Sequence, residues 1–528
     1  MLENTVKKTK KPPEDRTILQ VRAFNLLTKQ LITRNLQGAD RMRKSFVSQG
    51  RFDCTPIFDL QLNLSCRDEI VPMLGALQHL FTQSDLRRKL CLLVANDLNP
   101  ESRRDVGRPG FDDWQVLVLA VLRLGCNLDY DKLQDLSENH SNLRCVLGIG
   151  AWDDKTSFDW RRIQATITQL KPATIQKINQ TIVTYGQGLH GQASQSVRAD
   201  SFVIETNIHY PTESSLICDG VRKIVPLCVI LATELDQPGW RQADHLVKQI
   251  KKVVRKISQI AASKSPKAKA ALPAAYEELL NRTNVILERA KELQIAAKYE
   301  GKSISLLLRS DALKDWIELT NQVCQTAHRR VLLGESVPNQ EKLFSLFETH
   351  TQLYKRGKAS KPIQYGRLAL VFEDGAGFIS HYHLMDRNAS DADVIVDETR
   401  KAQKAHGGAI QSASFDRGFY TPENKGVLQS IVSKVSLGPR HPGKFAEHLS
   451  NESDAEQVLR HNHSGIESAI GGLQRGNGLQ RCRDRSELGL ERYLGLAVLG
   501  RNIQVLGKLL IIREVGDTIA SHSLRDAA

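Results

Sequence analysis

The residues of this chain best suited to do chemistry are three acids, Asp200, Asp416 and Glu467. Carboxylate oxygens suit Mg²⁺, and because this ion keeps several waters, one or two carboxylates per ion are enough. Two such ions about 3.5–4 Å apart can activate an attacking oxygen and stabilise a leaving oxygen in phosphoryl transfer. Three carboxylates, one of them shared, would hold both ions. The acids therefore predict a metal site if the fold brings them together.

Asp200 lies in an alternating segment that predicts a strand with both faces covered. One face carries Val197, Ala199, Ser201 and Val203, and the other carries Asp200, Phe202 and Ile204. A charge buried alone is costly, so such an aspartate normally has a cation, a set of donors or a metal as its partner. The plain alternative is a strand-end aspartate that caps the next turn.

The other two acids stand at the ends of later elements. Asp416 ends a short expected strand, after which the chain turns. Glu467 lies on the first helix after the sheet, beside the buried face that Ile466, Ile470 and Leu473 form, and can lean back over the sheet. Because the chain has 59 acidic residues, any triple can arise by chance. The order of the elements gives this one its weight.

The elements predicted around these acids follow an α/β order. After the strand of Asp200 come a helical stretch, a hairpin over 362–385, a helix over 391–405, a strand over 409–416, a helix over 422–428 and a strand over 431–437. Two helices follow, from about 463 and from 488 to about 512. This order predicts a mixed sheet with helices on its faces. An all-helical region precedes it, and a helical insertion follows its first strand.

The charge balance points to an anionic partner. The chain has 73 Lys and Arg against 59 Asp and Glu, a formal net charge of +14. Nucleic acid is the commonest such partner, and a membrane surface is the competing one. No signal peptide opens the chain, and no apolar run approaches the ~18 residues of a membrane span. The nine scattered cysteines lack a C-x-x-C pair and indicate reduced thiols in a cytoplasmic protein.

A basic run strengthens the expectation of a nucleic-acid partner. Residues 248–269 hold eight positive charges and no acid, and such charges repel one another unless an anion lies nearby. The residues expected to contact DNA are Lys248, Lys251, Lys252, Arg255, Lys256, Arg417 and Arg475. The plain alternative is a solvated helix face.

We expect the chain to divide at changes in composition and periodicity. The parts are a basic arm over 1–70, a helical DNA-binding domain over 71–192, the first part of a catalytic domain over 193–235, a helical insertion over 236–355, the second part over 356–515 and a tail over 516–528. In the helical domain over 71–192, Asp112 or Asp113 can cap a helix that ends at Gly125. That helix and the next are compatible with a helix-turn-helix.

A histidine-rich metal site is the competing chemistry. His381 and His383 stand near Asp386, and His461 stands near His463. Hairpin and helix-cap histidines are commoner than such a site. No Ser-His-Asp order, Walker loop or dinucleotide fingerprint stands out.

Several segments resemble the DDE transposases of bacterial insertion sequences, most closely the group labelled ISNCY. They read RADSFVIETNIHYPTESSL, KPIQYGRLALVFED, SFDRGFYTPEN and HSGIESAIGGLQRGNGLQRCRDRSELGLERYLGLAVLGRN, and the resemblance covers roughly residues 100 to 510. It implies a ribonuclease-H-like core in which Asp200, Asp416 and Glu467 hold two Mg²⁺ ions, for which Mn²⁺ could substitute. It also implies DNA strand cleavage and strand transfer at terminal inverted repeats. Holding two DNA ends together favours a homodimer or larger assembly.

Two departures from the family's pattern bear on the site. Many relatives have a basic residue about seven positions after the glutamate, where this chain has Gln474, and Arg475 lies about 80° from Glu467 on a helix. Glu213 stands where relatives more often have Asp, and we do not expect it to be catalytic.

Two other functions remain open at this point. The first is a domesticated DNA-binding protein without catalysis, and the second is a ribonuclease-H-like nuclease or resolvase. If Glu467 is not the third acid, Glu487 and Glu491 are the next candidates. We expect the protein in the cytoplasm, associated with the nucleoid and not with a membrane.

Overall fold

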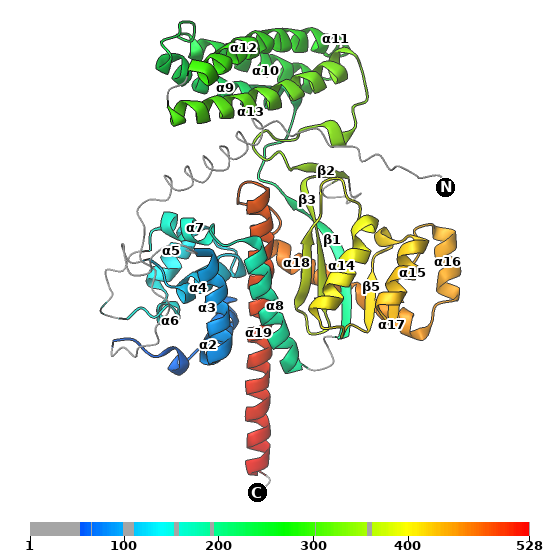
Figure 1. Ribbon diagram of the computed structural model, residues 1–528. Helices are drawn as coiled ribbons and strands as arrows, with labels where there is room; N and C mark the ends of the chain where they lie inside the picture. The colour runs from blue at the N-terminus through cyan, green and yellow to red at the C-terminus, as the bar shows by residue number, and fades with distance from the viewer. Residues whose placement is uncertain are drawn as a thin grey trace, which may run out of the picture.

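The structure is a computed structural model that describes residues 53–64, 66–98, 110–150, 152, 158–190, 195–300, 303–355 and 362–526. Most of the predicted basic arm lies outside these residues. Figure 1 shows a bundle of N-terminal helices on the left, a sheet with its own helices on the right, and a second helical unit above them. The long C-terminal helix runs between the bundle and the sheet.

The predicted all-helical region is a bundle. After a 3-10 turn, η1 (Ile57–Asp59), its helices are α2 (Ile70–Thr82), α3 (Ser84–Leu98), α4 (Asp113–Gly125), α5 (Tyr130–Asn139), α6 (Ser141–Val146), α7 (Trp160–Ile167) and α8 (Pro172–His190). Asp112 caps α4 in a capping box with Gln115, as the sequence predicted, and α4 ends at Gly125. The stretch from Trp160 to His190 forms two helices, α7 and α8, because Pro172 starts α8 and a proline suits only the first turn of a helix.

The last helix, α19 (Glu487–Asp526), is the central helix of the bundle. It packs against α2, α4 and α8, and its first half is almost wholly buried. Within the described residues, Glu487–Glu514 is long and apolar enough to cross a membrane, although the sequence analysis expected no run of that length. In this structure 61% of its apolar window is buried, as in a core helix.

The sheet has six strands in mixed orientation, as the α/β prediction requires. They are β1 (Ser196–Glu205), β2 (Gln352–Lys355), β3 (Ile363–Asp374), β4 (Ile379–Leu384), β5 (Ser412–Phe415) and β6 (Lys434–Ser436). The order is β2-β3-β1-β5-β6, and β4 pairs with β3 beside β2. β3 runs antiparallel to both β1 and β4, whereas β5 and β6 run parallel to β1.

Helices cover both faces of this sheet. One face packs on α14 (Asp391–Ala405) and α15 (Pro422–Ile431), and the other on α17 (Asp454–His463), α18 (Gly465–Arg475) and the bundle. Val197 and Ala199 lie in the first core, whereas Phe202 and Ile204 lie in the second, so the predicted alternation of β1 is confirmed. A short 3-10 turn, η6 (Arg417–Phe419), follows β5. The sequence analysis did not predict α17 or the preceding α16 (Pro442–Ser450).

The helical insertion begins earlier than predicted. It contains α9 (Glu213–Glu234), α10 (Ala243–Ala262), α11 (Pro266–Ala270), α12 (Leu272–Glu300) and α13 (Ile304–Ala327), followed by a short π-helix, η4 (His328–Leu332). The expected start at 236 left α9 in the catalytic part, but α9 shares a core with α10, α12 and α13. The helices of the insertion also end before the predicted boundary at 355. After η4, an irregular stretch with the turn η5 (Asn339–Glu341) leads into β2.

We predict that Gly500→Ala destabilises the protein by about 2 kcal/mol or more, since an added methyl group must push two helix backbones apart. A Cβ at Gly500 would lie 2.6 Å from the backbone of Gly125, where α19 crosses α4. Gly188 is the control, because a Cβ there meets nothing within 4 Å. Gly188→Ala should leave stability unchanged or raise it by up to about 1 kcal/mol. Equal unfolding midpoints in thermal denaturation of the two variants would contradict the close helix crossing.

Candidate active site

The pairing of β1 with β5 makes Asp200 and Asp416 neighbours. The parallel register runs from Ser196 opposite Ser412 to Ala199 opposite Phe415. Continued by one residue, it sets Asp200 beside Asp416, on backbones about 4.8 Å apart. Two acids that lie 216 positions apart in the sequence therefore meet at the centre of the sheet.

Both aspartates belong to the face that α17 and α18 cover. Alternate residues of a strand point to the same face of the sheet. Asp200 therefore lies on the same face as Arg198, and Asp416 lies on the same face as Ser414. Arg198 donates from Nη1 to the Asn462 carbonyl at 3.0 Å, at the end of α17. The Oγ of Ser414 lies 3.1 Å from Nδ1 of His463, the last residue of α17.

Helix α18 lies along β1 and runs in the same direction. Its first residue, Gly465, lies over Arg198, since a Cβ there would be 2.0 Å from Nη1 of that arginine. The chain after the helix reaches the far end of β1, where the Cys482 amide donates to the Glu205 carbonyl at 2.8 Å. Asp200 is about 6.6 Å beyond Arg198 along the strand, and Glu467 is about 3 Å beyond Gly465 along the helix. Glu467 and Asp200 therefore lie at similar levels along the sheet.

Arg198 fixes this arrangement. Its Nε donates to Oε2 of Glu373 on β3 at 2.6 Å, and that carboxylate is buried. The same guanidinium holds the Asn462 carbonyl, so one side chain links β3, β1 and the start of α18. Charge-assisted hydrogen bonds of this kind are shorter and stronger than neutral ones.

The predicted seam of α18 is confirmed. Ile466, Ile470 and Leu473 are buried, and Glu467 is exposed beside them. His463 lies one turn before Glu467, and both Asp416 and Glu467 act on it electrostatically. Burial lowers the pKa of His463 and outweighs these two carboxylates, which raise it. His463 is thus a neutral side chain near both Asp416 and Glu467 at pH 7.

The backbone orients the two aspartates. Oδ1 of Asp200 accepts from the Ser201 amide at 2.7 Å, and Oδ1 of Asp416 accepts from the Arg417 amide at 2.7 Å. Asp416 is also the N-cap of η6, which is the capping role considered as the alternative for a strand-end aspartate. The capping hydrogen bond to Oδ1 fixes the rotation of the carboxylate and is compatible with a second role.

A fourth acid near this point was missed from the sequence. Oδ1 of Asp391, in the first turn of α14, accepts from Ser201 Oγ at 2.7 Å. A Cβ at Gly418 would lie 3.5 Å from Oδ2 of Asp391 and 3.6 Å from Oδ2 of Asp416, so the two carboxylates are near each other. The sequence signal that could have pointed to Asp391 is the capping box of Ser390 and Asp393, because it places Asp391 in the first turn of α14.

The structure brings two of the three predicted acids together but does not gather all three. Across the described part of the chain, no three His, Cys, Asp or Glu side chains are placed to hold one metal ion. The oxygen donors of Asp200 and Asp416 suit Mg²⁺, which needs only one or two carboxylates. The exposed Glu467 would have to reorient to join them.

The histidines considered as metal ligands make other contacts. His381 Nε2 lies 2.7 Å and His383 Nδ1 lies 3.8 Å from the Glu398 carboxylate on α14, which Lys401 also contacts at 2.6 Å. Burial alone would raise the pKa of Glu398, but the hydrogen bonds from His381 and Lys401 lower it to about 2. This is an ion network that joins β4 to α14. His463 is engaged with Ser414, as described above.

The first fallback acid, Glu487, lies far from Asp200. Glu487 forms an ion pair with Arg367, which stands opposite Ile204 in the β1–β3 register. Ile204 is four residues beyond Asp200, or about 13 Å along the strand. Position therefore favours Glu467 over Glu487 as the third acid.

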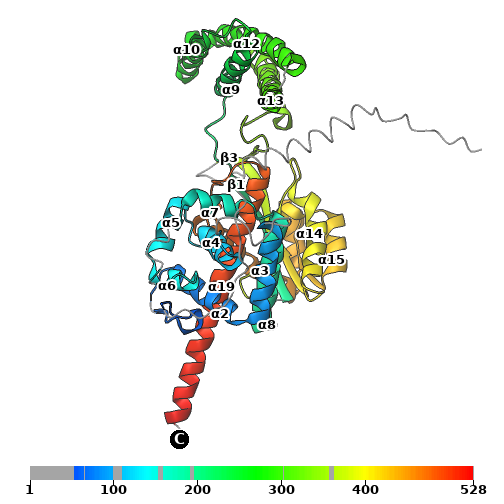
Figure 2. The same cartoon turned by 60° about the vertical axis from the view of Figure 1, so that its left-hand side comes forward.

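The predicted DNA-contacting residues are exposed but scattered. Lys248, Lys251, Lys252, Arg255 and Lys256 all lie on the exposed face of α10. Figure 2 places α10 at the outer edge of the helical unit, well away from the sheet. Lys256 is partly neutralised by Glu278 at 3.2 Å. Near the acids, the Arg417 guanidinium lies 4.7 Å from the centre of the Phe445 ring, and Arg475 is exposed at the end of α18.

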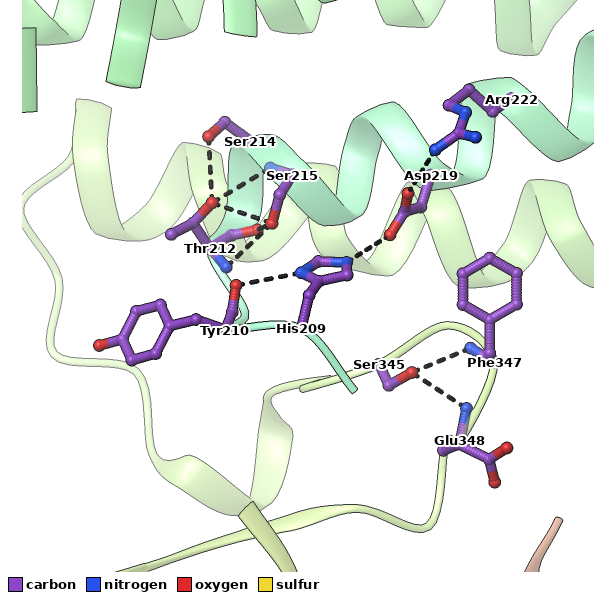
Figure 3. A network of polar contacts seen from close by, with 10 residues as sticks. All are labelled: His209, Tyr210, Thr212, Ser214, Ser215, Asp219, Arg222, Ser345, Phe347 and Glu348. Carbon is purple, nitrogen blue, oxygen red and sulfur yellow. Dashed lines mark hydrogen bonds and ion pairs between the residues drawn. The ribbon is translucent and has the colours of Figure 1, made fainter. Parts of the chain in front are cut away.

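A polar network fixes the connecting segment that leads from β1 into the helical unit (Figure 3). His209 Nε2 lies 2.7 Å from Oδ2 of Asp219, and Nδ1 lies 3.1 Å from the Tyr210 carbonyl. Thr212 caps α9 in a capping box with Ser215. On the returning segment before β2, the hydroxyl of Ser345 accepts from the amides of Phe347 and Glu348. Both connections to the helical unit are therefore ordered by local hydrogen bonds.

Comparison of the chain with models of protein families, with curated proteins and with solved structures finds no match. The assignment of function therefore depends on the geometry of the site and on the sequence resemblance.

We predict that Gly465→Ala loosens the start of α18. The added methyl group displaces the Arg198 guanidinium from Glu373 and Asn462, which should cost roughly 1–3 kcal/mol because those hydrogen bonds are charge-assisted. Hydrogen exchange of the amides of α18 should accelerate. Gly426→Ala on α15 is the control, because a Cβ there meets nothing within 4 Å. Unchanged exchange in Gly465→Ala would show that Arg198 does not hold the helix.

Proposed function

We propose that this protein is a DDE-type DNA transposase that cleaves DNA strands and transfers them at the inverted repeats of an insertion sequence. The observation that supports this most is the register that sets Asp200 beside Asp416, with α18 lying along the same strand. Two carboxylates at one point of a sheet repel each other, so their adjacency calls for a cation. Glu467 completes the set in this proposal, because it and Asp416 both act on His463.

The form of the sheet supports a ribonuclease-H-like core. An antiparallel β3–β4 hairpin stands on one side of β1, and the parallel strands β5 and β6 stand on the other. This puts the central strand, which carries the first acid, next to the strand that ends in the second. The core implied by the sequence resemblance needs both acids at one place, and this strand order supplies them.

The side chains of this site have distinct roles in the proposed reaction. Asp200 and Asp416 would hold Mg²⁺, with their rotation fixed by the amides of the following residues. When bound, the ions supply activation of the attacking oxygen and stabilisation of the leaving 3′ oxygen. His463, neutral at pH 7, adds no positive charge that would compete with a cation there. Arg198 is a positioning residue, since it acts through α18 on Glu467.

The basic residues supply the proposed DNA contacts. The exposed face of α10 suits the phosphate backbone, Arg417 directly follows Asp416, and Arg475 ends α18 about 12 Å along the helix from Glu467. Because α10 lies far from the sheet in Figure 2, DNA that reaches both places must cross the junction between the helical unit and the sheet. A homodimer or larger assembly is part of the proposal, because two DNA ends must be held together.

A ribonuclease-H-like nuclease or resolvase is the second candidate. The same pair of aspartates would serve hydrolysis of branched DNA without strand transfer. An assay that separates cleaved from joined products on inverted-repeat DNA distinguishes the two. DNA binding without any cleavage would favour the domesticated DNA-binding protein.

We predict that Asp200→Asn and Glu467→Gln each lower Mg²⁺-dependent cleavage of inverted-repeat DNA by roughly 10²-fold or more, because each removes a charge that holds metal. DNA binding in gel-shift assays should persist, since neither change removes a cation. Glu277→Gln, which changes an exposed residue of α12, is the matched control and should cleave normally. Normal cleavage by Glu467→Gln would remove this residue from the site.

We also predict that changing the five α10 cations to Gln weakens DNA binding and its dependence on salt. Each lost phosphate contact should reduce the slope of log affinity against log salt by ~0.9. The control changes five exposed lysines on other elements, namely Lys177, Lys298, Lys314, Lys434 and Lys444. If both sets reduce the slope equally, α10 is only a solvated face.

A further inference from the structure

A cavity of about 380 Å³ lies where the helical unit meets the edge of the sheet. Its wall comes from the start of α9, the end of α13 with η4, the turn η5, and the paired strands β2 and β3. Cavities that hold small organic ligands have volumes of roughly 300–1,000 Å³, so this one can take a ligand of moderate size. None of the predicted catalytic acids lines it.

One wall of the cavity is aromatic. The Tyr210 ring packs edge-on against the Tyr365 ring, with 5.8 Å between their centroids. Phe344 also packs on the Tyr365 ring, with 5.6 Å between their centroids. Phe344 is buried, whereas Tyr210 is 70% exposed. An aromatic ring that is held by its edge and exposed elsewhere offers a surface for a flat ligand.

The lining of the cavity also carries an excess of positive charge. Arg330, Lys342 and Lys355 line the cavity, and Glu213 is the one acid among the lining residues. Glu213 forms an ion pair with Arg330, which leaves two lysines without an acid in the cavity. Burial lowers the pKa of Lys342, and the charges of Arg330 and Lys355 lower it further. A bound anion would relieve this repulsion.

The aromatic wall is held in place before any ligand arrives. Tyr210 stands between His209, which is bound to Asp219, and Thr212, which caps α9 (Figure 3). Burial alone would lower the pKa of His209, but its hydrogen bonds to Asp219 and to the Tyr210 carbonyl raise it, so the contact strengthens as this histidine is protonated. A preorganised surface loses less entropy on binding than a mobile one.

We propose that this cavity binds a single unpaired nucleotide, with its base stacked on Tyr210 and its phosphate between Lys342 and Lys355. Aromatic rings beside cations suit this ligand, because every base has a flat face to stack and the phosphate carries the charge. Duplex DNA does not fit, because its bases are already stacked inside the helix. The nucleotide can be free, or it can be an unpaired residue within DNA. The inference uses neither the three acids nor a metal, so it can fail or succeed independently of the proposed function.

The test is equilibrium binding to the full-length protein in EDTA, with three probes: a deoxynucleoside monophosphate, a duplex with one unpaired nucleotide, and the fully paired duplex. Tyr210→Ala should weaken binding of an unpaired nucleotide by about tenfold or more, as the loss of one stacked base does. Lys342→Gln should weaken it as well. The matched controls are Tyr299→Ala and Lys298→Gln, which change exposed residues of α12. His209→Gln should have an intermediate effect.

The probes also identify the source of the nucleotide. Tyr210-dependent binding of the monophosphate alone assigns the cavity to a free nucleotide. Tyr210-dependent preference for the unpaired over the paired duplex assigns it to a nucleotide within DNA. If Tyr210→Ala and Lys342→Gln bind all three probes as tightly as their controls do, the proposal is wrong. Circular dichroism and the unfolding midpoint of each variant separate this outcome from misfolding.

Discussion

The parallel pairing of β1 with β5 is the constraint on which the site depends. Its register alone sets Asp200 beside Asp416, and the alternation of strand residues turns both toward α17 and α18. A slip of one residue in either strand would turn that strand's acid to the opposite face, so a buried sheet core strongly resists such a slip. The apolar residues of β1 and β5 that pack on α14 and α15 therefore specify where the two carboxylates lie.

The third part of the site depends on a polar contact, not on the core. Arg198 joins Glu373, the end of α17 and the start of α18, and so fixes the level of Glu467 along β1. The remaining freedom belongs to the Glu467 side chain, which is exposed. In the proposed site the two aspartates are held by backbone amides, and the exposed Glu467 would reorient to join them.

The sequence predicted the elements whose period is clear. The alternation around Asp200, the hairpin over 362–385 and the helix over 391–405 are present, because each has a strong pattern and clear turn residues. It misplaced the start of the insertion, because the apolar residues of α9 fit either the catalytic part or a helical unit, and only packing decides between them. Asp391 and Arg198 were missed as neighbours of the site. Their roles arise from tertiary contacts that no local pattern marks.

The central claim is that Asp200, Asp416 and Glu467 together hold divalent metal for chemistry on DNA. The most direct measurement is the anomalous scattering of Mn²⁺ in crystals of the protein bound to DNA. This account predicts two peaks about 3.5–4 Å apart, in contact with both aspartates and with a reoriented Glu467. Manganese bound elsewhere, with no peak between Asp200 and Asp416, would contradict it.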